Sequence, residues 1–102
     1  MWPTMGVGLD PETSCITLTG QIRAADVPQL AAAMGSVMEE GAKITLDLSR
    51  ATLLDSATLG QIVGFHMRCK GKRAQLVLRR PTLTVRDTLD VTMLSSIFTI
   101  ED

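Results

Sequence analysis

Residues 43–49 have the sequence Lys-Ile-Thr-Leu-Asp-Leu-Ser, in which apolar and polar side chains alternate without a break. This period of two predicts a β-strand with one buried face and one polar face. Ile44, Leu46 and Leu48 are expected to point into the core. A strand buried on both faces would instead be a nearly continuous apolar run. The pattern therefore predicts a sheet that helices cover on one face only.

The segments before this strand predict two more strands and a helix. Residues 14–19 also alternate, and Gly20 is expected to end that strand; a further edge strand is expected before residue 10. Asp26 can cap a helix that has Pro28 in its first turn, where the missing N–H costs nothing. Gly41 suits the stop of that helix. Apolar residues recur in it at helical spacing: Val27, Leu30, Ala31, Met34, Val37 and Met38.

The segments after residue 49 continue the alternation of helix and strand. Residues 51–56 are expected to form a loop, and the helix that follows is expected to end near Gly71. Its predicted apolar stripe consists of Leu59, Ile62, Val63 and Met67. Residues 74–78 and 96–100 have the pattern of short strands, and Pro81 can start a helix between them. That third helix is expected to bury Leu83, Leu89 and Val91.

The predicted order is β-β-α-β-α-β-α-β, which implies mostly parallel strands joined by right-handed crossovers. If each new strand is added at the same edge of the sheet, right-handed crossovers place every helix on the same face of the sheet. We therefore predict one α/β domain over residues 1–102, a two-layer fold with a four- to five-stranded sheet. No internal repeat or linker interrupts it.

Composition excludes several classes of protein. Hydrophobic residues make up 45% of the 102 residues, so a core can form, and the net charge of −1 gives no field that favours nucleic acid. No apolar run has the length of a membrane span, and no signal peptide is evident. Cys15 and Cys69 lack metal-ligand spacing, and the single histidine, His66, excludes a site built from several histidines. We expect a reduced, cytoplasmic protein without a cofactor or metal, and not an enzyme.

Residues 55–60, Asp-Ser-Ala-Thr-Leu-Gly, stand where a helix begins and allow two interpretations. In the structural one, Asp55 or Ser56 caps the helix, or Thr58 and Gln61 form a capping box slightly later. In the functional one, Ser56 is a phosphorylation site, because the helix dipole and terminal N–H groups favour negative charge there.

Three sequence segments resemble those of the STAS domain family, and most closely its free-standing bacterial anti-sigma factor antagonists. The first is Leu18-Thr19-Gly20, like the family's Leu-Thr-Gly before its first helix. The second is residues 55–60, similar to the hallmark Asp-Ser-Ser-Gly-Leu-Gly. The third is Pro81, Asp90 and the apolar residues 97–100.

The resemblance implies a partner switch centred on Ser56. In such antagonists an anti-sigma factor that is also a serine kinase phosphorylates this serine and is released, and a phosphatase restores binding. Carried over by position, Asp55 would assist kinase recognition, while Leu59 and Gly60 would shape the contact face. Ala57 and Thr58 replace the hallmark Ser and Gly, which makes Thr58 an alternative acceptor or an obstacle. Where antagonists often have Gly-Glu-Leu-Asp, this chain has Gly20-Gln-Ile-Arg23, so Arg23 alters the charge of the partner face.

Other functions stay open at this stage. STAS-like proteins also serve as accessory subunits of bacterial lipid-transport ATPase complexes, and nucleotide binding by a STAS sensor is a further alternative. The basic residues Arg68, Lys70, Lys72, Arg73, Arg79 and Arg80 are interpreted as solvated helix and strand ends, because no aromatic platform accompanies them. No direct contact with nucleic acid is expected, and the sequence leaves open whether the chain forms a homodimer.

Overall fold

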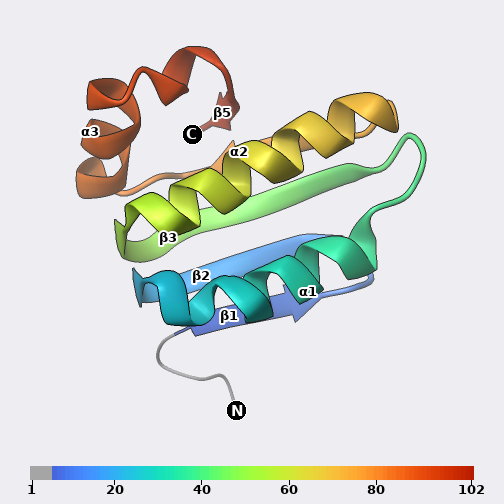
Figure 1. Cartoon of the computed structure of the whole chain (residues 1–102), viewed down its shortest axis with the longest axis horizontal. Coiled ribbons are helices and arrows are strands. Elements are labelled where there is room, and N and C mark those ends of the chain that lie inside the picture. The colour runs from blue at the N-terminus through green and yellow to red at the C-terminus, as the bar shows by residue number, and fades with distance from the viewer. Residues whose placement is uncertain (1–5) are drawn as a thin grey trace.

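A computed structural model describes residues 6–102, which form one five-stranded sheet in the spatial order β1-β2-β3-β4-β5 (Figure 1). β1 and β2 are antiparallel, and the remaining neighbours are parallel. The strands are β1 (Gly6–Asp10), β2 (Cys15–Ile22), β3 (Lys43–Leu54), β4 (Gln75–Arg79) and β5 (Thr99–Glu101). The helices are η1 (Ala24–Asp26), α1 (Val27–Val37), α2 (Ser56–Gly71), α3 (Leu83–Val91) and η2 (Leu94–Ser96). The predicted α/β class and mostly parallel sheet are confirmed.

α1 and α2 lie side by side over the same face of the sheet (Figure 1). This is the layering expected when parallel strands add in one direction through right-handed crossovers. α3 packs against the far end of β3, where the Thr82 hydroxyl donates to the Ala51 carbonyl at 2.7 Å. Thr82 also caps α3 by accepting from the Val85 N–H.

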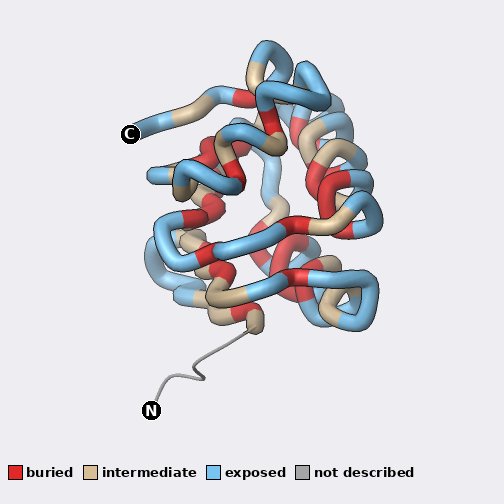
Figure 2. The backbone as a smooth tube through the Cα atoms, turned by 90° about the vertical axis from the view of Figure 1, so that its left-hand side faces the viewer, coloured by how far each residue is buried: buried red, intermediate tan, exposed pale blue. Residues whose placement is uncertain are grey.

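The core lies between the sheet and these helices, where the buried stretches of strands and helices face one another (Figure 2). Ile44, Leu46 and Leu48 are completely buried, as their alternation predicts. Ile16 and Leu18 on β2 and Leu30 and Met34 on α1 join the same cluster. Thr45 and Asp47, which alternate with the core residues of β3, are only partly buried. Apart from Val77 of β4, which is buried on the opposite side from Leu76 and Leu78, the sheet therefore has one apolar face and one polar face.

β2 and β3 both run further than the sequence predicts. β2 continues through Gly20, which has a φ of +81°, to Ile22, and the register between the two strands shifts on either side of Gly20. The sequence predicts a loop at residues 51–56, but residues 51–54 belong to β3, which ends at Leu54. The buried positions change from every second to every third residue: Leu48, Ala51 and Leu54. A β-bulge produces such a change, because an extra residue reverses the face on which later side chains lie.

The predicted apolar stripe of α2 is partly wrong. Leu59 and Ile62 are buried, but Met67 is 59% exposed and Val63 is only partly covered. Phe65 and Cys69 complete the buried face instead. Phe65 and Met67 are two residues apart, and the helical period that passes through Leu59 and Ile62 continues to Phe65 and Cys69 and not to Met67.

The ends of α1 and the C-terminal segment also differ from the predictions. α1 ends at Val37 and not at Gly41, and Asp26 makes no side-chain bond to its first turn. In α3 the buried residues are Val85 and Leu89, whereas Leu83 and Val91 are largely exposed. The last strand spans only Thr99–Glu101, because residues 94–96 form a 3₁₀ turn. Within residues 6–102, no helix is both long enough and apolar enough to cross a bilayer.

Candidate functional site

The candidate site lies where β3 ends at Leu54 and α2 begins at Ser56. Asp55 between them has the extended backbone of an N-cap residue, with φ −81° and ψ 176°. Its Oδ1 accepts from the Thr58 N–H at 2.9 Å, which satisfies one of the N–H groups that lack a partner within the helix. Of the candidate caps, the residue that performs this role is therefore Asp55.

The Asp55 carboxylate also ties α2 to the turn that follows β2. Oδ2 accepts from the Ala24 N–H at 2.8 Å, and the Asp55 N–H donates to the Ile22 carbonyl at 3.1 Å. The Thr58 N–H and hydroxyl, together with the Ala24 N–H and the charge of Arg23, hold the pKa of this carboxyl below its usual range. The group is thus a fixed anion that joins two crossover connections.

Thr58 is a structural residue in this arrangement. Its side chain has no exposed surface. The hydroxyl proton is shared between two acceptors, Asp55 Oδ1 at 2.8 Å and the Ile22 carbonyl at 3.1 Å. A buried hydroxyl with both bonds made is costly to remove and closed to an approaching protein.

The predicted contact residues divide into an outer and an inner group. Of these, Ser56 and Gly60 are exposed on the first turns of α2, as is the intervening Ala57, and a Cβ at position 60 would meet no atom within 4 Å. Leu59 points inward and is 8% exposed. The small exposed residues leave the backbone of α2 open to close approach. Leu59 supports this surface from below.

Arg23 lies at the edge of the same site, directly before η1. Its N–H donates to Asp26 Oδ2 at 2.9 Å, and its guanidinium donates to the Gln21 side-chain oxygen. The next residue, Ala24, makes the backbone bond to Asp55. The structure therefore brings Arg23, Asp55 and Ser56 to one end of the sheet, where η1 and the start of α2 lie close together (Figure 1).

The sequence does not indicate that Ala24 and Ile22 bind Asp55 and Thr58. Both act through backbone atoms, which donate and accept irrespective of side-chain type. Their partners, Asp55 and Thr58, are 31 and 36 residues away along the chain.

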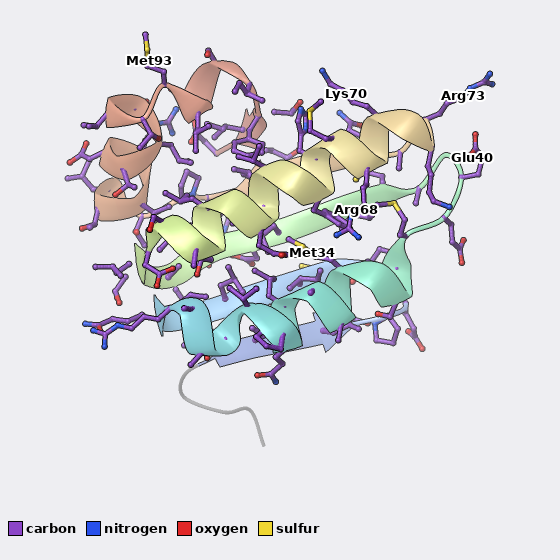
Figure 3. All side chains as sticks on the ribbon, in the orientation of Figure 1. Met34, Glu40, Arg68, Lys70, Arg73 and Met93 are labelled. Carbon is purple, nitrogen blue, oxygen red and sulfur yellow. The ribbon has the colours of Figure 1, made fainter. Side chains whose placement is uncertain are left out.

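The basic stretch belongs to a different part of the molecule. Arg68, Lys70 and Arg73 project from the last turns of α2 and the turn after it, at the opposite end of the helix from Ser56 (Figure 3). Cations at a helix C-terminus interact favourably with its dipole, which accounts for them. Arg68 also lies over the Phe65 ring, 5.8 Å from its centroid.

The remaining candidate groups do not assemble into a chemical centre. Within residues 6–102, no three His, Cys, Asp or Glu side chains come together as metal ligands. His66 packs edge-on against Phe98, with ring centroids 5.3 Å apart. Cys15 and Cys69 are both free thiols, and burial raises the pKa of each above the ordinary value.

A protein family matches most of the chain. A family model described as "Mlab, STAS domain" matches residues 5–99. A search of the curated proteins finds no match.

Three solved structures have a similar fold at low sequence identity. The anti-sigma factor antagonist SpoIIAA in its unphosphorylated form is 21% identical, over 93% of this chain and 87% of that chain, with a TM-score of 0.76. An anti-sigma factor antagonist (STAS) domain protein from Planctomyces limnophilus is 19% identical over 94% and 87%, with a TM-score of 0.77. A candidate anti-sigma factor antagonist from Thermotoga maritima is 20% identical over 96% and 86%, with a TM-score of 0.75.

Proposed function

The chain belongs to the STAS domain family, and we propose that it is a protein-binding switch controlled by phosphorylation of Ser56. Its partner in this proposal is an anti-sigma factor that is also a serine kinase, and a phosphatase reverses the modification. The proposal acts through binding and needs no catalytic group in this chain. The three solved structures with this fold are described as anti-sigma factor antagonists, which supports the choice of partner.

The observation that carries the proposal is that Ser56 is exposed and does not cap α2. A serine at a helix start usually serves the helix, since its oxygen accepts from an N–H of the first turn. Here Asp55 accepts that bond, and Ser56 lies outside it. The Ser56 hydroxyl is thus available to a kinase without loss of the cap.

Phosphorylation at this position changes what the surface can bind. It adds about −1.5 to −2 charge at pH 7 to a turn whose exposed side chains are small. The first N–H groups of α2 and the helix dipole tolerate that charge, so the fold is retained. A partner that buries Ser56 would have to desolvate the added charge and make room for the added bulk, which is costly. The modified chain is therefore released.

Ser56 is a better acceptor than Thr58 on the same evidence. Transfer to a hydroxyl requires the oxygen to reach the kinase active site, and the Thr58 oxygen is buried with two partners. We therefore assign Thr58 to holding α2 against β2, and Ser56 to the switch.

The test is incubation of the full chain with ATP and the serine-kinase anti-sigma factor, followed by mass spectrometry of the peptide that contains residues 55–60. We expect one phosphate on Ser56 and none on the matched variant Ser56→Ala. Absence of phosphate from both Ser56 and Thr58, together with unchanged partner binding by Ser56→Asp, contradicts the proposal.

A second candidate is an accessory subunit that docks on a transport ATPase without being phosphorylated. One observation favours it: the matching family model is described by the name Mlab, and the solved structures described as anti-sigma factor antagonists are at most 21% identical. A pull-down with the tagged chain separates the candidates. Recovery of a transporter ATPase and no kinase, with binding unaffected by Ser56→Asp, selects the second.

A further inference from the structure

We propose that Arg23 is the internal counter-ion of phosphorylated Ser56. On this inference, which rests on the proposed function, the guanidinium leaves Gln21 and pairs with the phosphate when Ser56 is modified. The phosphorylated state is then a distinct arrangement of the docking surface, with Arg23 drawn over the start of α2.

The backbone places Arg23 within reach of this position. The Ala24 N–H is 2.8 Å from Asp55 Oδ2, so the turn that follows β2 is joined to the start of α2 at this point. Arg23 precedes Ala24 and Ser56 follows Asp55, and consecutive Cα atoms are about 3.8 Å apart. Arg23 and Ser56 are thus each one residue away from the two bonded groups, and the long, exposed side chain of Arg23 can extend toward the start of α2.

The charges around Arg23 leave it available for an anion. Its guanidinium bonds to the neutral Gln21 side chain, and within residues 6–102 the ion pair formed is Arg86 with Asp102, at 2.6 Å. Asp26 lies nearby but accepts from the backbone N–H of Arg23. The Asp55 carboxylate is occupied by Ala24 and Thr58. A phosphate offers three strong acceptor oxygens and more charge than either carboxylate, and arginine pairs with phosphate through two parallel bonds.

Without Arg23, phosphorylation would place the phosphate beside the Asp55 carboxylate with no cation to offset the repulsion. Asp55 cannot move away, since it caps α2 and holds η1. The charge of Arg23 contributes, less than the hydrogen bonds from Thr58 and Ala24, to lowering the pKa of Asp55. The same guanidinium is therefore placed to neutralise a second anion at the adjacent residue.

The test is a ³¹P NMR titration of the full chain with phosphoserine incorporated at position 56 during synthesis, so no kinase is required. The second pKa of phosphoserine is about 6. A neighbouring guanidinium lowers such a pKa by about one unit or more, so we expect the wild-type phosphate to titrate below the Arg23→Gln variant by that amount. Arg23→Lys should show an intermediate value, because lysine supplies the charge without the two-bond fork.

The matched control is Arg50→Gln, which removes the same charge from an exposed position on β3, six residues before Ser56. We expect its phosphate to titrate like that of the wild type. Equal pKa values in Arg23→Gln and Arg50→Gln overturn the inference. This outcome is separate from failure of the proposed function, which is measured by the kinase reaction on the unmodified chain.

Discussion

Two neighbouring residues, Asp55 and Ser56, have different tasks although the sequence pattern allows either of them to cap α2. Asp55 accepts bonds from Thr58 and Ala24, whereas Ser56 is exposed. We expect Ser56→Ala to leave the thermal midpoint unchanged and Asp55→Ala to lower it clearly, because only the second change removes a cap. Differential scanning calorimetry of the two variants checks this. A larger loss for Ser56→Ala would mean that the serine is the cap and is not free for modification.

Thr58 provides the second residue-scale prediction. Thr58→Val keeps the shape of the side chain but removes the hydroxyl from a site with no exposed surface. It removes the hydroxyl's bonds to the charged Asp55 carboxylate and to the Ile22 carbonyl, so we expect a loss of about 1–3 kcal/mol in the free energy of unfolding. The matched control is Thr52→Val, an exposed threonine on β3, which should change stability by no more than about 0.5 kcal/mol. Urea denaturation of both variants measures the difference, and equal values would contradict the structural role of Thr58.

At the scale of the residue, the sequence points to the candidate site but does not show which of its residues caps α2. The Asp-Ser pair at a helix start is visible in the pattern. The choice of Asp55 as cap depends on Ala24, a backbone donor 31 residues earlier. No side-chain pattern records such a contact, because every residue except proline has that N–H.

At the scale of the element, two substitutions on α2 test which face of this helix packs against the sheet. Phe65 is completely buried, whereas Met67, which the predicted stripe includes, is 59% exposed. We expect Phe65→Ala to cost about 3–5 kcal/mol, because it removes a buried ring and leaves a cavity. Met67→Ala should cost no more than about 0.5 kcal/mol, as at other exposed positions. Comparable losses in chemical denaturation would show that α2 is rotated relative to the sheet.

His66 gives an element-scale prediction for pH. Burial against Phe98 and, to a smaller extent, the charge of Lys70 lower the pKa of His66 below 6.5. The unfolded chain then binds the proton more readily than the folded one, so this contribution to stability is complete above pH 6.5 and is lost as the pH falls through the folded pKa. Urea unfolding at several pH values should show this decline in the wild type and a smaller one in His66→Gln. An identical pH dependence in both proteins would contradict it.

The elements that the sequence predicts least well are those whose pattern changes along their length. β3 alternates over residues 43–49 and is predicted there, but its last part buries every third residue. The cause is the irregular pairing with β2 around Gly20, a property of two strands together and not of either alone. The predicted buried face of α3 is wrong for a related reason. The apolar pattern of this helix is short, so its buried face is determined only by its packing on β3.

On the scale of the whole molecule, the architecture could be predicted because many residues agree on it. The alternation in β2 and in residues 43–49 of β3 argues against a second helical layer, and the order of elements favours parallel strands joined by crossovers. The observed strand order and the similar fold of the solved structures agree with that outcome. The fold alone does not name a partner, since one fold serves many functions. The proposed function depends instead on two facts about the start of α2: Ser56 is exposed, and Asp55 caps the helix without it.

The central claim is tested most directly by measuring how tightly the anti-sigma factor binds the chain with and without phosphoserine at position 56. Isothermal titration calorimetry with both forms gives the two dissociation constants under the same conditions. We expect the unmodified chain to bind and the phosphorylated chain to bind at least about tenfold more weakly, because the interface would have to bury the phosphate. Equal dissociation constants for the two forms would contradict the account.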